Sequence, residues 1–272
     1  MSPFLAAVCQ MTSTSDAPAN LRQAEALIRA AVARGAALVA TPENTNFLGP
    51  HADKVSSAET LEGPTCSRFA ALAHELGIHL LLGSFNEKGP DPDHCFNTSA
   101  LFGPDGRCLA VYRKIHLFDV EVPGAVTFRE SATVAPGSEV VVAATPIAWL
   151  GLSICYDLRF GELYRALVER GAQVIAIPSA FTAATGKAHW EVLVRARAIE
   201  TQCWVIAPGQ HGRHDDGGLR ESHGHSLIVD PWGQVVAQVP DGPGLAVAEI
   251  DLERISRVRH AIPVGAHRRL PG

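Results

Sequence analysis

Neither sign of charge dominates this sequence, and charged residues of any kind are few. Lys and Arg together number 23, and Asp and Glu 28, in a chain of 272 residues, which gives a formal net charge of -5. Proteins that bind nucleic acid or anionic membrane surfaces usually carry a basic excess, which this composition does not supply. We therefore expect no nucleic-acid partner and no membrane partner.

The sequence also lacks C-x-x-C pairs and long uninterrupted apolar runs. Its six cysteines are scattered, which in a chain large enough to have its own core argues against a disulfide framework and for a reducing compartment. No apolar stretch is long enough to span a bilayer without a charge or a proline, and the first residues lack the basic region of a signal peptide. We expect a cytoplasmic protein.

Hydrophobic residues are plentiful, at 47% of the chain, and their spacing alternates between two patterns. Short apolar runs are typical of buried strands, whereas apolar residues three and four positions apart are typical of helices. Strands are expected at residues 4–9, 36–40, 78–85, 95–102, 108–112, 140–154, 174–177, 203–207, 226–229, 235–239 and 245–250. Helices are expected at residues 21–34 with Asn20 as cap, 66–76 with Thr65 as cap, 163–170 and 188–201.

This alternation of strands and helices predicts an α/β protein in which mixed sheets are flanked by helices. No linker, repeat or low-complexity segment divides the sequence. Residues 1–272 are therefore expected to form a single domain.

One apolar run, residues 140–154, ends abruptly in Cys155, and helical spacing follows it. A strand-to-helix turn holds a side chain rigidly above a sheet, and the amino terminus of the following helix favours a thiolate. Taken alone, a cysteine in an apolar strand is more often an inert core residue. The case for a nucleophile depends on the residues that join it.

Glu43 and Lys114 also follow apolar strands directly. Functional groups in α/β sheets collect beyond the carboxyl ends of strands, so these two side chains and Cys155 are expected to converge on one crevice. A carboxylate within reach serves as base for a thiol, and a lysine ammonium lowers the thiol pKa and stabilises an oxyanion. The backbone N–H of Tyr156 is the natural second oxyanion donor. Considered singly, Glu43 is more often a turn carboxylate, and Lys114 is more often a solvated residue at the end of a hairpin.

Three segments resemble the signatures of the nitrilase (carbon–nitrogen hydrolase) superfamily: Pro42-Glu43-Asn44, residues 112–117 (YRKIHL) and residues 154–160 (ICYDLRF). The similarity continues through residues 178–181, 188–200 and 224–233, in order. It implies a four-layer α-β-β-α sandwich, a Glu43–Lys114–Cys155 triad with Glu130 as supporting second glutamate, no metal or cofactor, and a homodimer packed helix to helix.

Within that family, the segments at residues 201–203, 212–214 and 267–269 are most similar to the deaminated-glutathione amidase branch. The resemblance implies a thiol amidohydrolase that cleaves a small acidic amide through an acyl-enzyme. An ω-amidase acting on 2-oxoglutaramate, nitrile hydrolysis and carbamoyl-amide cleavage stay open, as does, in a different class, a catalytically idle interaction module.

An acidic substrate requires positive charge or N–H groups in the pocket. Arg159 lies one helical turn beyond Cys155 and suits a carboxylate; the alternative is that it pairs with Asp157 or Glu162. Thr185 is expected at the amino terminus of the 188–201 helix, an anion-binding position, and Phe181 is expected to form an apolar wall.

Four histidines cluster in the segment from residue 211 to 225: His211, His214, His223 and His225. Their spacing matches no standard zinc pattern, and two adjacent glycines suggest a loop. We interpret them as solvated loop residues, with no metal bound.

Overall fold

The computed structural model describes residues 2–122, 126–218 and 220–269, and twelve of its strands form two six-stranded sheets. The strands of the first sheet are, in spatial order, β16 (Gly244–Ile250), β1 (Phe4–Gln10), β2 (Ala36–Ala40), β3 (His79–Asp91), β4 (His94–Phe102) and β5 (Cys108–Arg113). Those of the second are β15 (Val235–Gln238), β14 (Leu227–Val229), β11 (Trp204–Ala207), β10 (Val174–Ala176), β9 (Trp149–Leu152) and β8 (Val142–Ala144). At the centre of each sheet three strands run parallel, β1–β2–β3 and β9–β10–β11.

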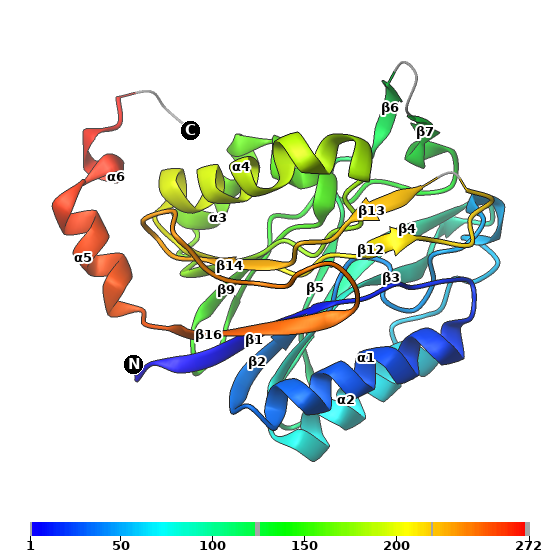
Figure 1. Cartoon of the computed structure of the whole chain (residues 1–272), viewed down its shortest axis with the longest axis horizontal. Coiled ribbons are helices and arrows are strands. Elements are labelled where there is room, and N and C mark those ends of the chain that lie inside the picture. The colour runs from blue at the N-terminus through cyan, green and yellow to red at the C-terminus, as the bar shows by residue number, and fades with distance from the viewer. Residues whose placement is uncertain (1, 123–125, 219, 270–272) are drawn as a thin grey trace.

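Two helices cover the outer face of each sheet (Figure 1). Helices α1 (Ala17–Val32) and α2 (Pro64–Leu76) pack on the first sheet, and α3 (Gly161–Glu169) and α4 (Ala183–Thr201) lie over the second. The inner faces of the sheets meet in one apolar cluster, which contains Val8 and Leu38 of the first sheet and Leu150 and Val205 of the second. The predicted α-β-β-α sandwich is confirmed.

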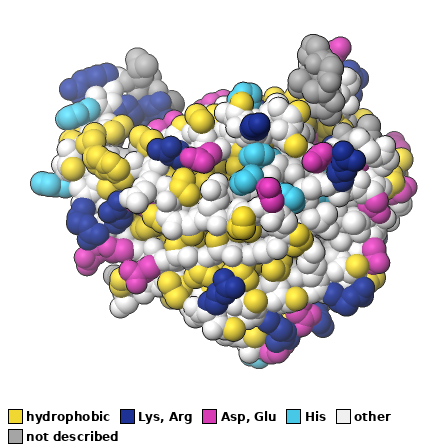
Figure 2. Space-filling view, viewed as in Figure 1, with side chains coloured by type: hydrophobic (Ala, Val, Ile, Leu, Met, Phe, Trp, Pro, Cys, Tyr) yellow, Lys and Arg dark blue, Asp and Glu magenta, His cyan; other side chains and the backbone are white. Residues whose placement is uncertain are grey.

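Smaller elements lie at the ends and edges of this sandwich. They are the hairpins β6 (Asp119–Val122)–β7 (Val126–Arg129) and β12 (His211–Arg213)–β13 (Glu221–His223), the 3-10 helices η1 (His51–Asp53), η2 (Glu130–Ala132) and η3 (Cys155–Arg159), and the C-terminal helices α5 (Glu253–Ala261) and α6 (Val264–His267). In the described part of the chain no helix is long and apolar enough to cross a bilayer. On the face shown in Figure 2, side chains of both charges are interspersed. A single domain over residues 1–272 stays a prediction.

The expected strand at residues 140–154 is wrong as one element. It is a hairpin of β8 and β9, closed where the Thr145 N–H and hydroxyl both donate to the Ala148 carbonyl, at 3.1 and 2.7 Å. Pro146 inside this turn cannot donate to a sheet ladder, which accounts for the break.

Two expected helix caps are also wrong. Asp16 caps α1, because its Oδ1 accepts from the Ala19 N–H at 2.9 Å. Asn20 lies inside that helix, where its buried side chain donates to the Asn46 carbonyl at 2.9 Å. Thr65 lies inside α2, whose N-cap is Gly63. Asn and Thr have cap-forming side chains, but the chain direction before each helix decides which residue stands at the cap.

Candidate active site

All eight residues that the sequence suggested for the site line one pocket: Glu43, Lys114, Glu130, Cys155, Tyr156, Arg159, Phe181 and Thr185. Glu43 stands three residues beyond β2, Lys114 directly follows β5, and Cys155 stands three residues beyond β9. The first two come from one sheet and the third from the other. The expected convergence at strand ends is therefore present in the structure.

The segment that carries Glu43 is fixed by its backbone as well as by its side chain. Gly83 of β3 passes so close to it that a Cβ there would meet the Thr41 carbonyl oxygen at 1.9 Å. The Asn44 N–H donates to Ser84 Oγ at 2.8 Å, and Gln210 Nε2 donates to the Glu43 carbonyl at 2.9 Å. These contacts place Glu43 before any substrate arrives.

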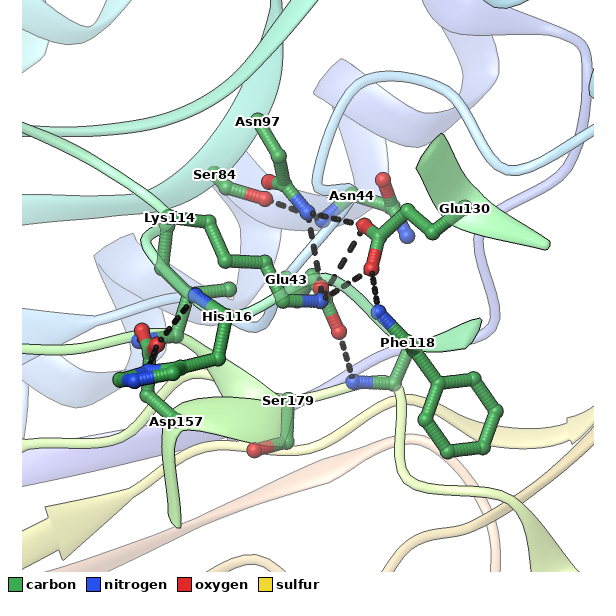
Figure 3. A network of polar contacts seen from close by, with 12 residues as sticks. Glu43, Asn44, Ser84, Asn97, Lys114, His116, Phe118, Glu130, Asp157 and Ser179 are labelled. Atoms are coloured by element: carbon green, nitrogen blue, oxygen red, sulfur yellow. Dashed lines mark hydrogen bonds and ion pairs between the residues drawn. The ribbon is translucent and has the colours of Figure 1, made fainter. Parts of the chain in front are cut away.

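Lys114 lies between two carboxylates (Figure 3). Its Nζ donates to Glu43 Oε1 at 3.0 Å and to Glu130 Oε2 at 2.9 Å. Asn97 of β4 donates from Nδ2 to Glu43 Oε1 at 2.8 Å. The other oxygen of Glu43, Oε2, accepts from the Ala180 N–H at 2.7 Å. Both carboxylates and the ammonium are buried, so their orientation is fixed by the protein and not by solvent.

The charges of this network control one another. Burial disfavours the ammonium of Lys114, but Glu130 and Glu43 outweigh it and raise the pKa of Lys114 well above its ordinary value. Burial likewise acts against the carboxylate of Glu130, but Lys114, then Lys54, lower its pKa to about 2. Lys114 is therefore a fixed positive charge next to the thiol.

Replacing Glu130 with glutamine is expected to lower the free energy of unfolding by about 3 kcal/mol near pH 7. The pKa of Glu130 falls from 4.5 to about 2 on folding, and about 1.4 kcal/mol corresponds to each pH unit. A carboxylate with a depressed folded-state pKa stabilises above its unfolded pKa and loses that contribution as the pH falls through the folded value. The difference between wild type and variant should therefore shrink between about pH 4.5 and pH 2.

Urea unfolding at a series of pH values measures this difference, with the exposed Glu62→Gln as the control for losing one surface carboxylate. A wild-type advantage that stays constant down to pH 2 would show that the charge of Glu130 is not its source.

Cys155 stands at a strained turn. Its φ is +48°, a left-handed conformation that is uncommon for a residue with a side chain and is typical of functional turns. Its N–H donates to the Pro178 carbonyl at 2.9 Å, and helix η3 begins at the cysteine itself. The first N–H groups of a helix have no partner within it, which leaves the Tyr156 N–H directed out of the helix end.

The buried carboxylate of Asp157 stabilises this turn through hydrogen bonds. Its Oδ2 accepts from the Tyr112 hydroxyl at 2.6 Å and from the Ile154 N–H at 2.9 Å. Its Oδ1 accepts from the His116 N–H at 3.0 Å and lies 2.7 Å from His116 Nδ1. The carboxylate thereby ties the residue before Cys155 to the segment that carries Lys114, so the two catalytic candidates are held by one buried group.

The expected low pKa of the thiol is wrong. Burial, then the Glu43 carboxylate, raises the pKa of Cys155 well above its ordinary value, and Lys114 opposes this shift only in part. The sequence indicated a lysine near the thiol but did not indicate that the cysteine is buried, and burial disfavours a thiolate. The raised pKa favours the thiol form of Cys155, so a base such as Glu43 must remove its proton as the reaction proceeds.

Arg159, Phe181 and Thr185 all line the pocket. The Arg159 guanidinium lies 5.2 Å from the centroid of the Phe181 ring, and both Nη atoms lie 3.4 Å from His189 Nδ1. Arg159 forms no ion pair with a described carboxylate, so the pairing with Asp157 or Glu162 is wrong.

Thr185 lies in the first turn of α4, at the amino terminus of the helix as expected, and the helix begins at Ala183, earlier than the expected residue 188. Its hydroxyl lies 3.0 Å from that of the N-cap residue Thr182. Both threonines line the pocket, so the amino-terminal end of α4 faces the site as predicted.

Two cations and one amide are among the residues of the pocket and its network that the sequence did not predict. Lys54 comes from the irregular segment after β2, Arg220 from the segment between β12 and β13, and Asn97 from β4. None follows a strand end in a recognisable motif. Asn97 is one of three adjacent polar residues in the mostly apolar strand β4. This polar interruption is the feature of the sequence that could have indicated a buried polar site.

The histidine segment is only partly as expected. His214 is buried, where Nδ1 lies 2.8 Å from the Ser13 carbonyl oxygen and Nε2 lies 2.9 Å from Ser222 Oγ, so it is a structural residue and not a solvated one. Burial lowers its pKa. No group of three or more His, Cys, Asp or Glu side chains in the described residues is placed to hold a metal ion.

Comparison with known proteins agrees with this geometry. A family model described as carbon-nitrogen hydrolase matches residues 5–260. A deaminated glutathione amidase of Synechocystis is 46% identical over 271 residues, which cover 98% of this chain and 99% of that protein. Human omega-amidase NIT2 is 39% identical over 271 residues, covering 99% of this chain and 96% of that protein.

Among solved structures, the NitFhit protein of C. elegans matches with a TM-score of 0.92 at 43% identity. The alignment covers 99% of this chain, which spans 66% of the length of that protein. The resemblance to the nitrilase superfamily is thus confirmed by sequence and by fold. The chain belongs to the carbon–nitrogen hydrolase family and is an enzyme that hydrolyses carbon–nitrogen bonds.

Proposed function

We propose that this enzyme is an amidase in which Cys155 is the nucleophile, Glu43 the general base and Lys114 the main oxyanion donor. The observation that carries the proposal is the buried contact of Lys114 with Glu43 at 3.0 Å, in the pocket that also contains the strained cysteine. A thiol needs a base and the developing oxyanion needs a positive donor, and one carboxylate–ammonium pair supplies both.

In the first half of the reaction Glu43 takes the proton of the Cys155 thiol as sulfur attacks the amide carbonyl carbon. The carbonyl oxygen becomes an oxyanion, bound by Lys114 Nζ and the Tyr156 N–H. The C–N bond then breaks, the proton on Glu43 passes to the departing nitrogen, and a thioester to Cys155 remains.

In the second half water enters where the amine has left. Glu43 removes a proton from it, the resulting hydroxide attacks the thioester carbonyl, and sulfur departs and regains a proton from Glu43. The sequence of steps consumes one water and yields one acid and one amine. Glu43 is suited to exchange this proton twice because Ala180, Asn97 and Lys114 hold its carboxylate in place throughout.

The proposed substrate is deaminated glutathione, an amide of 2-oxoglutarate. The support for it is the 46% identical relative, which is named deaminated glutathione amidase. The cationic Arg159 on the pocket wall supports an acidic substrate. An ω-amidase acting on 2-oxoglutaramate is the second candidate, favoured by the 39% identical human relative. A cytoplasmic homodimer packed helix to helix is the expected setting for either activity.

The substrate proposal predicts a preference for acidic amides that depends on Arg159. A charge-assisted contact contributes about 1.5–3 kcal/mol, so removing the carboxylate from a substrate should lower kcat/KM about 10- to 100-fold. Arg159→Ala should flatten the preference, and Arg159→Lys should keep part of it because lysine lacks the planar fork. Release of 2-oxoglutarate from deaminated glutathione and from 2-oxoglutaramate measures which amide is preferred.

The exposed Arg213 provides the matched control, as Arg213→Ala removes the same charge away from the pocket. Equal discrimination by wild type and Arg159→Ala would remove Arg159 from the binding site. Higher kcat/KM for 2-oxoglutaramate than for deaminated glutathione would favour the ω-amidase.

A further inference from the structure

Asn44, the residue after the proposed general base, carries a buried amide oxygen that has no hydrogen-bond partner. The residue is 3% exposed and lines the same pocket as Cys155. Its backbone is held on both sides, because its N–H donates to Ser84 Oγ at 2.8 Å and its carbonyl accepts from Gln210 Nε2 at 3.3 Å. Its side-chain Oδ1, in contrast, accepts no hydrogen bond from any described residue.

A buried polar atom without a hydrogen bond is uncommon in a folded protein and calls for a reason. Among the described residues that line the pocket, Asn44 is the one whose side chain has such an atom. Its φ of +57° is a left-handed conformation that asparagine tolerates. Glycine would satisfy that backbone requirement equally well. The backbone therefore does not account for an amide oxygen in the pocket, whereas a partner from outside the chain does.

The carboxylates next to this oxygen in the site are already engaged (Figure 3). Glu43 Oε1 accepts from Lys114 Nζ at 3.0 Å, and Oε2 accepts from the Ala180 N–H at 2.7 Å. Both oxygens of Glu130 accept from Lys114 Nζ, at 3.1 and 2.9 Å. The amide oxygen of Asn44 is thus an acceptor that the described part of the network leaves open for a ligand.

A scissile amide presents one acceptor, its carbonyl oxygen, and one kind of donor, its N–H. In the proposed mechanism the carbonyl oxygen is bound by Lys114 Nζ and the Tyr156 N–H. The nitrogen must lie close to Glu43, because that carboxylate returns a proton to the departing amine. The N–H on this nitrogen therefore needs an acceptor beside Glu43, and Asn44 is the next residue in the chain, in the same pocket.

We propose that Asn44 Oδ1 accepts a hydrogen bond from the N–H of the scissile amide, so that the enzyme selects amides with at least one hydrogen on the leaving nitrogen. This inference rests on the proposed amidase function and deepens it. An ester with the same acyl group has no such hydrogen and leaves the buried oxygen unpaired, which costs more than a hydrogen bond that is merely not gained. An amide with two alkyl groups on its nitrogen has the same defect.

The test compares two derivatives of 2-oxoglutarate that differ only in N–H against O, the N-methyl amide and the methyl ester of its 5-carboxyl group. Asn44→Gly keeps the left-handed backbone and removes the acceptor. The ratio of kcat/KM for the amide to that for the ester should fall about 10-fold in this variant. The greater intrinsic reactivity of the ester cancels in this comparison, as does any loss of folded protein, because both substrates are measured on each protein.

Asn86→Ala is the matched control. Asn86 of β3 also has a buried Oδ1 without a partner, but it does not line the pocket, so the ratio should stay as in the wild type. An equal loss of kcat/KM for both substrates in Asn44→Gly would contradict the proposal and show that Asn44 only positions Glu43. A loss confined to kcat would also contradict it, because both substrates form the same acyl-enzyme and the oxygen would then hold the water that hydrolyses it.

A binding measurement separates this contact from the amidase function itself. In the Cys155→Ser background, calorimetry should show the N-methyl amide binding about 10-fold more tightly than the methyl ester, and adding Asn44→Gly should remove the difference. Absence of all hydrolysis by the wild type, together with this Asn44-dependent preference in binding, would reject the reaction and keep the contact. Full amidase activity without an Asn44-dependent preference in either measurement would reject the contact and keep the reaction.

Discussion

Replacing Cys155 with serine is expected to abolish amide hydrolysis, with kcat reduced on the order of 10³-fold or more. A serine hydroxyl has a far higher pKa than a thiol, and a single carboxylate is too weak a base to make it a nucleophile. The fold should persist, because serine differs from cysteine by one atom and Glu43 remains within reach as an acceptor. Initial rates of amine release measure the effect, and thermal unfolding checks the fold.

Cys108→Ser is the control, since Cys108 is exposed and lies on β5 away from the pocket lining. It should retain wild-type turnover. Turnover by Cys155→Ser within about tenfold of the wild type would rule out Cys155 as the nucleophile and transfer the attack to another group.

The second large effect concerns Lys114. Lys114→Ala is expected to lower kcat by more than the roughly 10²- to 10³-fold that follows from losing one neutral oxyanion donor, since a charge is lost as well. The structure adds a consequence for stability: Glu43 and Glu130 would face each other without their shared cation. Removing one partner of a buried pair typically costs about 3–5 kcal/mol.

A second variant separates catalysis from folding. In Lys114→Ala combined with Glu130→Gln one carboxylate is removed with the cation, so stability should recover in part while kcat stays low. Steady-state kinetics and urea unfolding on both variants measure the two effects. A change confined to KM would make Lys114 a substrate-binding residue, and recovery of kcat in the double variant would show that the loss in Lys114→Ala came from misfolding.

The positions of the catalytic candidates were determined by the sequence alone. Glu43, Lys114 and Cys155 each interrupt an apolar pattern at a strand end, and parallel strands present their carboxyl ends on one side of a sheet. The alternation of strand and helix spacing also predicted mixed sheets flanked by helices, whereas the four-layer arrangement was implied by the family resemblance. These features are local or follow from short periodic patterns, so they can be predicted without knowing the tertiary contacts.

The tertiary structure decided the rest, because burial and pairing join residues far apart in sequence. The pKa of Cys155 rises instead of falling because burial and Glu43 together outweigh Lys114. A strand pattern in the sequence predicts neither the burial of the thiol nor its distance from Glu43.

The pocket cations show the same limit. Lys54 and Arg220 lie on irregular segments with no periodicity, and nothing local distinguishes them from surface residues. Only the packing of both sheets encloses Lys54 beside Cys155 and gives Arg220 its partner Asp216. Spacing along the chain thus determined where the reactive groups stand, while the long-range packing determined their protonation and the charge that surrounds them, since electrostatic energies depend on burial and distance in space.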